Sequence, residues 1–283
     1  MSPLVSVVMP VYNGAATVEE ALSSLLVQTH ADLEIIAVDD GSTDGTPDII
    51  AGIRDARIRL LRQEHLGLVG ALNAGCTLAR GEYIARLDGD DIAAERRIEA
   101  QLAFMEHHGE VGLLGTWARV VKEGEPPRVF APPSSDAALR RCLLLDSPFV
   151  HSSVMFRRRA YLETGGYPDG LNEDYRLWIR MARSWKVAVL PQVLVTHRVH
   201  AGSYTRSIRR RQMLRARLAT QWEATRALGL WLAAIPALGL TTVAYLLSLV
   251  GGGFEEAVRR ATAGLTARLR GFRREDDRDA RGA

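Results

Sequence analysis

The chain has 283 residues, of which 47% are hydrophobic and 24% are charged, so it can form one sizeable α/β domain with an appendage and is not disordered throughout. Its two cysteines, Cys76 and Cys142, lack the number and spacing of a disulfide framework or a zinc site, and we expect free thiols. Residues 206–283 carry 15 basic and 7 acidic side chains, which favours an anionic membrane surface over nucleic acid as a partner.

The first hundred residues alternate short apolar runs with helical patterns. We predict strands at residues 5–9, 33–38, 58–61 and 83–87, and helices from about 17, at 47–54 and at 68–79. Strands that alternate with helices indicate parallel βαβ units, so we predict an α/β fold with a mainly parallel central sheet flanked by helices. The first strand follows residues 1–3 directly, and we expect no secretion leader.

Polar residues follow three of these strands. Pro10 and Tyr12 come at the end of the first strand, and Asp39 and Asp40 at the end of the second. Because the carboxyl ends of parallel strands meet at one edge of a sheet, a carboxylate there can accept hydrogen bonds from a base or ribose, and a tyrosine can provide a stacking face. Taken alone, the two aspartates would also fit turn and cap positions.

The fourth strand ends in three carboxylates, Asp88, Asp90 and Asp91, around Gly89. Hard oxygen ligands this close together suit Mg²⁺ or Mn²⁺, which commonly share their coordination with substrate phosphates. Alternatively, Asp90 or Asp91 caps a helix that begins near Ala93. Capping accounts for one carboxylate and leaves the other two unexplained.

Three segments, residues 5–14, 38–44 and 87–91, together resemble the family 2 glycosyltransferases, and the resemblance extends over residues 5–203. It implies the GT-A fold, which binds nucleotide sugars. The residues that it assigns to the nucleotide are Pro10, Tyr12 and Asp40, with Asp40 facing the base and Asp88 at the ribose. It makes Asp90 the principal metal ligand, beside Asp88. Residues 71–73, Ala-Leu-Asn, depart from the family, since many relatives have an arginine before the asparagine.

The middle of the chain supplies the acceptor side. We predict a strand over residues 111–121 that crosses the sheet, a surface loop over 125–133, and a further strand introduced by residues 147–156. His151, at the start of that strand, is a candidate acceptor contact, although a lone histidine is more often structural.

Glu173 and Asp174 form a second acidic site. Inverting sugar transfer needs a general base for the acceptor hydroxyl, and one positioned carboxylate is sufficient. Asp174 could instead cap a helix that starts at Tyr175, with Glu173 as first-turn charge. The pair is similar to the base motif of the family, which implies that Asp174 is catalytic and that Glu173 belongs to the substrate site.

Residues 196–203 resemble an arginine-x-histidine loop of the family. The resemblance implies that His200 completes the metal site or touches the diphosphate, and that Arg198 offsets leaving-group charge. Processive relatives have a Gln-x-x-Arg-Trp motif. The corresponding run from Gln212 lacks the tryptophan, which favours transfer of a single sugar.

The carboxyl-terminal part contains 28 consecutive residues without a charged side chain, 227–254, flanked by arginines. This length suits a kinked membrane span or a re-entrant hairpin with both ends cytoplasmic; the alternative is a helical hairpin packed on the catalytic domain. We therefore predict a catalytic domain, residues 1–205, a basic helical region, residues 206–283, and a location at the cytoplasmic face of the membrane.

The sequence thus predicts an inverting glycosyltransferase dependent on Mn²⁺ or Mg²⁺. It would move one sugar from a nucleoside diphosphate sugar, expected to be a UDP-sugar, to a hydroxyl of a sugar, glycolipid or lipid-linked glycan during cell-surface polysaccharide or glycolipid assembly. One rival is a nucleotidyltransferase, which would need a basic loop after the first strand, and residues 11–17 contain no basic residue. The other rival is a non-catalytic nucleotide-sugar-binding subunit.

Overall fold

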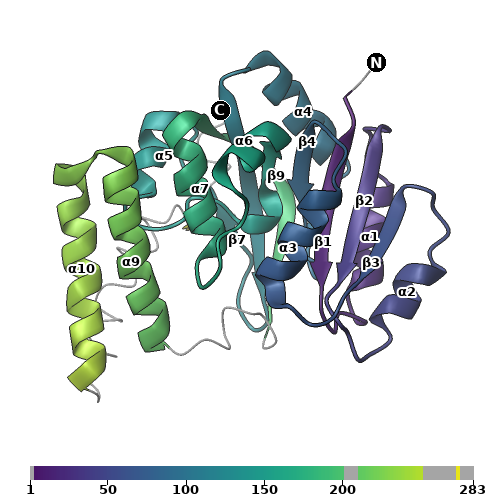
Figure 1. The fold of residues 1–283 in the computed structure, drawn as a ribbon, viewed down its shortest axis with the longest axis horizontal. Coiled ribbons are helices and arrows are strands. Elements are labelled where there is room, and N and C mark those ends of the chain that lie inside the picture. The colour runs from purple at the N-terminus through teal and green to yellow at the C-terminus, as the bar shows by residue number, and fades with distance from the viewer. Residues whose placement is uncertain (1–2, 201–209, 251–271, 275–283) are drawn as a thin grey trace.

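The computed structural model describes residues 3–200, 210–250 and 272–274 (Figure 1). Within these residues the chain forms a ten-stranded sheet with helices on both faces. The amino-terminal elements are β1 (Val5–Val11), α1 (Val18–Leu26), β2 (Leu33–Asp39), α2 (Thr46–Gly52), β3 (Ile58–Arg62), α3 (Gly67–Leu78), β4 (Tyr83–Arg86), β5 (Ile92–Ala93) and α4 (Arg97–His107). The later elements are β6 (Val111–Lys122), β7 (Arg128–Phe130), α5 (Asp136–Cys142), β8 (Met155–Arg157), α6 (Arg158–Thr164), α7 (Glu173–Ser184), β9 (Lys186–Val199), α9 (Arg210–Leu228), α10 (Trp231–Val250) and β10 (Phe272–Arg274).

Strands β3, β2, β1 and β4 form a parallel half of the sheet, as predicted. β1 pairs with β2 along its whole length, so that Val11 lies opposite Asp39, and it pairs with β4 up to Val8 opposite Arg86. Every residue of β1, β2 and β4 is buried, because helices cover both faces of this half. The register brings the ends of these strands to one edge of the sheet.

The other half of the sheet is mixed, so the prediction of a mainly parallel sheet is wrong for this half. β8 runs antiparallel to both β4 and β6, whereas β9 runs parallel to β6. β7 lies antiparallel to β6 and to β10. The regular βα alternation in the sequence ends near residue 90, and beyond it strand directions depend on non-local pairing.

Two local predictions also need correction. The expected loop over residues 125–133 contains β7, whose Val129 and Phe130 are buried against the sheet. No helix begins near Ala93: residues Ile92–Ala93 form β5, which pairs with β9, and α4 begins only at Arg97. The capping alternative for the acidic cluster therefore has no helix at the expected position.

Two hydrophobic cores lie on opposite faces of the sheet. Alternate residues of β1 enter them: Val8 packs on the side of α3 and α7, and Met9 on the side of α1 and α4. α3 approaches β1 closely, since a Cβ at Gly75 would lie 2.5 Å from Val8 Cγ1. Trp178 of α7 is fully buried in the first core, where truncation of a tryptophan costs about 3–5 kcal/mol. Trp178 therefore anchors α7 one helical turn after Asp174.

Both cysteines are free, as predicted. Cys76 lies on α3 and is buried in the first core, and burial raises the pKa of its thiol to about 12. Cys142 ends α5 and is partly buried, which also raises its pKa.

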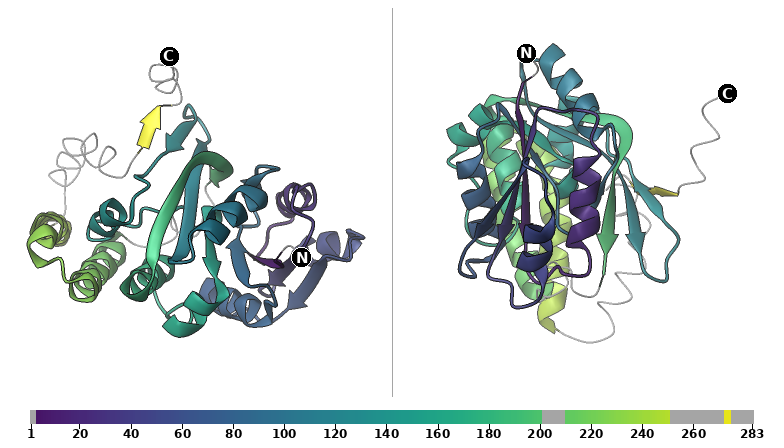
Figure 2. Two further views of the ribbon diagram at one scale, coloured as in Figure 1. Left: turned by 90° about the horizontal axis from the view of Figure 1, so that it is seen from above. Right: turned by 90° about the vertical axis from the view of Figure 1, so that its right-hand side faces the viewer.

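The helices α9 and α10 form a hairpin at one end of the molecule, with α9 against α7 and α10 against α9 (Figures 1 and 2). Gly229, with φ of 68°, makes the turn between them. Gln221 of α9 is buried and its Nε2 donates to the carbonyl of Leu145 at 2.8 Å. The division between residues 1–205 and 206–283 stays a prediction, although α9 and the catalytic part adjoin.

The predicted membrane segment is divided between the end of α9 and α10, and residues 251–254 lie outside the described part of the chain. α10 turns Ala234 and Ala237 inward. Its other face exposes apolar side chains, namely Leu232 (86% exposed), Ile235 (63%), Val243 (53%) and Leu246 (53%). In the described residues, no helix has both the length and the hydrophobicity required to span a bilayer.

Candidate functional site

The segments that follow β1, β2 and β4 are joined to one another at the sheet edge. The backbone N–H of Asp40 donates to the carbonyl of Val11 at 2.9 Å, which ties the end of β2 to that of β1. Thr17, just before α1, donates through its hydroxyl to the carbonyl of Gly89 at 2.8 Å. The acidic loop after β4 is thereby held against the loop after β1.

The acidic cluster is assembled as predicted. Asp88, Asp90 and Asp91 each place a carboxylate oxygen within 4.8 Å of the others, and only Asp91 is fully buried. Oxygen atoms at this separation are the donor set that Mg²⁺ and Mn²⁺ prefer, so the residues present fit a divalent ion.

Arg86 and Ser152 hold the carboxylate of Asp88 in place. The guanidinium of Arg86, 2% exposed, forms an ion pair with the Asp88 carboxylate, and the Ser152 hydroxyl donates to Asp88 Oδ2 at 2.9 Å. Burial alone would raise the pKa of Asp88, but the charge and hydrogen bond of Arg86 outweigh it and hold the pKa at about 2. Asp88 is therefore ionised at every physiological pH.

The pKa of Asp90 is shifted in the opposite direction from that of Asp88. Burial and the charges of Asp88 and Asp91 raise its pKa, since three carboxylates close together repel one another. His200 Nε2 lies 2.8 Å from Asp90 Oδ2, so the structure brings these two predicted ligands together. A divalent cation would relieve the repulsion that the cluster carries.

The carboxylate of Asp40 is engaged by other groups of the protein. Its carboxylate is 3% exposed and accepts hydrogen bonds from Gln63 Nε2 at 2.7 Å and from the backbone N–H groups of Leu66 and Gly67 at 2.9 Å. His65 Nδ1 lies 2.9 Å from the same carboxylate. In this structure Asp40 therefore organises the segment between β3 and α3, and its predicted contact with a base would require these partners to rearrange.

Tyr12 provides an exposed aromatic face beside this segment. Its ring is 48% exposed and packs against the His65 ring, with the centroids 4.2 Å apart and the planes tilted by 31°. Pro10 lies within β1 and is buried. The nucleotide roles of Pro10 and Tyr12 stay predictions.

A short 3₁₀ helix, His151–Ser153, lies between the two acidic sites. The prediction that His151 starts a strand is wrong, because β8 begins only at Met155. His151 Nε2 lies 2.9 Å from the Tyr167 hydroxyl, and its ring packs edge-on against Trp178. Burial and the nearby Arg86 charge lower the pKa of His151 well below its usual value, so its imidazole is neutral.

Glu173 and Asp174 form the first turn of α7, at its amino terminus. Asn172, in the left-handed region with φ of 60°, precedes the helix, so Asp174 is not the cap of a helix that begins at Tyr175. Burial raises the pKa of Asp174 to about 6, and burial together with the Asp174 charge raises that of Glu173 to about 8. Asp174 is therefore the more acidic of the two carboxyls and the one suited to act as a general base.

Arg198 lies within β9, and its Nη2 forms an ion pair with Glu20 Oε2 of α1 at 2.8 Å. In this structure the guanidinium thus connects β9 to α1. Its predicted role at the leaving group stays a prediction.

Several residues of the site were not predicted from the sequence. Arg86 and Arg97 are fully buried cations, and Arg97 Nη2 donates to the carbonyl of Arg86 at 2.8 Å. A charged residue inside an otherwise apolar strand was the available signal for Arg86, because a buried cation needs an anion nearby. Ser152, His65 and His197 had no such signal, since their partners are distant in sequence.

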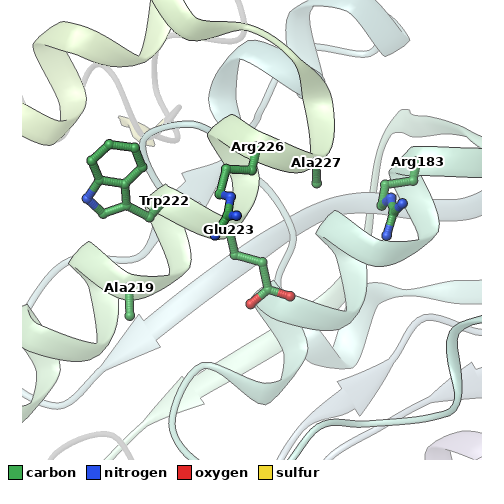
Figure 3. Close-up of a pocket in the computed structure, with 6 residues that line it drawn as sticks. All are labelled: Arg183, Ala219, Trp222, Glu223, Arg226 and Ala227. Atoms are coloured by element: carbon green, nitrogen blue, oxygen red, sulfur yellow. The ribbon is translucent and has the colours of Figure 1, made fainter.

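A surface groove of about 430 Å³ lies between α7 and α9 (Figure 3). Its lining residues are Arg183, Ala219, Trp222, Glu223, Arg226 and Ala227. None of the predicted donor, metal or base residues lines it, so it is separate from the acidic sites.

Comparison with known sequences gives a consistent result. The profile described as "Glycosyl transferase family 2" matches residues 6–166. An "uncharacterized glycosyltransferase" of Haemophilus influenzae is 30% identical over 223 residues, which cover 73% of this chain and 68% of the relative. The Escherichia coli protein WfaP, named UDP-Glc:alpha-D-GlcNAc-diphosphoundecaprenol beta-1,3-glucosyltransferase, is 33% identical over 205 residues, or 71% of this chain and 79% of its own.

Solved structures share the fold. TarS of Staphylococcus aureus, residues 1–349 in complex with UDP-GlcNAc, has a TM-score of 0.64 at 22% identity, over 77% of this chain and 66% of its own. The mannosyltransferase PcManGT of Pyrobaculum calidifontis, in complex with GDP-Man and Mn²⁺, has a TM-score of 0.61 at 23% identity. The match covers 94% of this chain and 81% of PcManGT. At this identity the likeness concerns the fold, and it confirms the GT-A class expected from the sequence.

Proposed function

Because the chain belongs to glycosyltransferase family 2, we propose that it transfers one sugar, with inversion, from a nucleoside diphosphate sugar to a hydroxyl acceptor. The relatives named above are glycosyltransferases, which favours this activity over nucleotidyl transfer and over a non-catalytic subunit.

One observation carries the proposal: the 3₁₀ helix His151–Ser153 connects two acidic sites of different character. Ser152 donates to Asp88 of the acidic cluster, and the adjacent His151 packs on Trp178 of the helix that bears Asp174. A carboxylate kept ionised and a carboxyl with a pKa near neutrality are thus placed on either side of one short segment. The ionised carboxylate suits a metal ligand, and the carboxyl with the raised pKa suits a general base.

The residues divide the reaction between them. The Asp174 carboxylate accepts the proton of the acceptor hydroxyl as that oxygen attacks the anomeric carbon, while the bond from this carbon to the diphosphate breaks. Glu173, whose pKa is raised by burial and by the Asp174 charge, donates a hydrogen bond to the acceptor in its protonated form. One direct displacement inverts the configuration of the sugar.

The metal site in this proposal consists of Asp88, Asp90 and His200. Oxygen and imidazole donors suit Mn²⁺, and Mg²⁺ is the alternative. A bound ion would supply charge neutralisation to the departing diphosphate. Support comes from the 2.8 Å separation of Asp90 and His200 and from the Mn²⁺ that PcManGT binds.

We expect uridine in the donor and a membrane-bound acceptor. WfaP is named for UDP-Glc and for a diphosphoundecaprenol acceptor, and TarS was solved with UDP-GlcNAc. PcManGT, by contrast, was solved with GDP-Man, so the base is the first quantity to test.

We also propose that the protein lies on the cytoplasmic face of a membrane. The exposed apolar face of α10 continues at the helix turn into Trp222 and Trp231, whose rings are 6.0 Å apart and about half exposed. Tryptophan is enriched at bilayer interfaces, and the basic charge of residues 206–283 suits anionic lipids. In this arrangement α10 rests in the interface and does not cross it.

Vesicle flotation tests this part of the proposal. We expect the full chain to rise with phosphatidylglycerol vesicles. The double variant Leu232→Glu/Val243→Glu should stay in the dense fraction. Leu162→Glu, at a leucine of α6 that is 57% exposed and so close to Val243 in exposure, is the control. Equal flotation of all three proteins would refute attachment through α10.

Release of nucleoside diphosphate from UDP- and GDP-sugars tests the activity itself. We expect release from a UDP-sugar with Mn²⁺ or Mg²⁺, its loss with EDTA, and its loss in Asp174→Asn. Asp169→Asn, on the exposed loop before α7, is the control and should remain active. A protein that binds no nucleotide in the presence of either metal would contradict the proposal.

A further inference from the structure

The third carboxylate of the acidic cluster, Asp91, differs from its two neighbours. Asp91 is 0% exposed, whereas the side chains of Asp88 and Asp90 are each 28% exposed. We infer that Asp91 is a positioning residue: together with His197 it fixes the end of β9 so that His200 stands beside Asp90, and it is not itself a metal ligand. The inference rests on the metal site of the proposed function.

Both oxygens of Asp91 are already engaged by β9. Oδ1 accepts a hydrogen bond from the backbone N–H of Arg198 at 2.8 Å. His197 Nδ1 lies 2.9 Å from Oδ2 and 3.2 Å from Oδ1. A carboxylate satisfied in this way would have to leave its partners in the strand before it could coordinate an ion, and that would leave buried polar groups unpaired.

The backbone around Asp91 continues this connection. The next two residues form β5, in which Ile92 pairs with Thr196 and Ala93 with Val195, and the N–H of Ala94 donates to the carbonyl of Leu194 at 2.9 Å. The Asp91 side chain therefore extends the ladder between β5 and β9 by one further step. It takes the place of a backbone carbonyl as acceptor for Arg198.

The other edge of the same stretch of β9 is also paired. His197 and Val199 lie opposite Val120 and Lys122 of β6. The end of β9 is thus held between β6 on one side and Asp91 on the other, and His200 follows directly. His200 reaches Asp90 across 110 residues of sequence, which requires the end of β9 to be well fixed.

A double-mutant cycle tests the inference. Binding of Mn²⁺ together with UDP would be measured by calorimetry for the wild type, Asp91→Ala, His200→Ala and the double variant. We expect Asp91→Ala to weaken Mn²⁺ affinity by about 10-fold to 100-fold, as is usual for residues that orient a ligand. In the His200→Ala background the same change should have almost no effect, because Asp91 acts through His200.

Further variants separate this result from simple loss of structure. Asp91→Asn keeps an acceptor for the Arg198 N–H and should lose less affinity than Asp91→Ala. Asp55→Asn, which breaks a carboxylate–arginine pair far from the cluster, should leave Mn²⁺ affinity unchanged. Thermal unfolding identifies any variant that is not folded, and Asp91→Asn then replaces Asp91→Ala in the cycle.

The outcomes distinguish failure of this inference from failure of the proposed metal site. If the wild type binds Mn²⁺ with UDP and the effects of Asp91 and His200 simply add, Asp91 acts independently of His200 and the inference is overturned. If Asp91→Asn costs as much as Asp90→Asn, Asp91 is a ligand. A wild type that does not bind Mn²⁺ would overturn the metal site of the proposed function and this inference with it.

Discussion

Replacing Asp174 with asparagine is expected to make the protein more stable and much less active. Asparagine keeps the size of the side chain and an oxygen that can accept the hydrogen bond from the Tyr175 N–H at 2.6 Å. Only the negative charge is lost. Burial raises the pKa of Asp174 from 3.8 to about 6, so the folded state disfavours the charged form.

The size of this stabilisation follows from the shift in the pKa of Asp174. A difference of roughly 2 pKa units at about 1.4 kcal/mol each means that ionisation at pH 7 costs the fold about 3 kcal/mol. This is an upper value, because Asp174 is only partly buried and Glu173 shares the same surroundings. In a domain of this size, 1 kcal/mol changes the Tm by about 2–4 °C, so Asp174→Asn should raise the Tm by up to about 6–12 °C.

The direction of the pKa shift determines how the stabilisation by Asp174→Asn depends on pH. The folded state holds the Asp174 proton more tightly than the unfolded state, so there is no cost below the unfolded pKa of 3.8, and the full cost is reached above the folded pKa of about 6. The Tm advantage of Asp174→Asn should therefore be largest above pH 7 and shrink toward pH 4. Wild-type kcat should rise with pH around the same folded pKa, as expected for a base that must be ionised.

Differential scanning calorimetry and steady-state kinetics over the pH range check these expectations. Turnover of Asp174→Asn should fall by a factor on the order of 10² or more while donor affinity is retained. A variant that melts below the wild type, or has a Tm difference independent of pH, would refute the electrostatic reasoning. Retained turnover at saturating donor would show that Asp174 is not the base.

Three further predictions concern the donor side. Asp90→Ala should abolish the metal-dependent part of donor affinity, and equal calorimetric affinity with and without Mn²⁺ in both proteins would contradict the assignment. Arg86→Met should destabilise the fold by up to about 3–5 kcal/mol, because it removes the buried cation that neutralises Asp88, whereas Arg80→Met, at an arginine whose side chain is 66% exposed, should cost under about 1 kcal/mol; denaturant unfolding compares them. An α-linked donor should give a β-linked product, and NMR coupling constants that show retention would exclude direct displacement.

The parallel half of the sheet could be predicted because its information is local. Runs such as residues 5–9 and 33–38 are apolar except for Ser6 and Glu34, and this nearly continuous pattern identifies strands buried on both faces. The carboxyl ends of such strands share an edge, so the acidic cluster was placed correctly from residue order alone.

The rest of the site depends on contacts between segments distant in sequence. Nothing near Asp40 indicates that Leu66 and Gly67 will donate to it, and nothing near Asp91 indicates His197. The direction of β8 and the pairing of β7 are likewise set by their partners across the sheet. Local patterns predicted which residues are polar at the edge, but the partners that occupy them come from the completed fold.

The buried thiol of Cys76 makes the wild-type chain its own folding probe. A thiol reacts as the thiolate, and with a pKa of about 12 and only 2% exposure Cys76 reacts when the core around α3 opens. The rate of labelling by a thiol reagent therefore measures how often this core opens, without any engineered label. Cys142, partly buried at the end of α5, reports on that helix in the same experiment. If a nucleotide and a metal close the molecule as one unit, both thiols become slower to label; if they order only the donor edge, Cys142 keeps its rate.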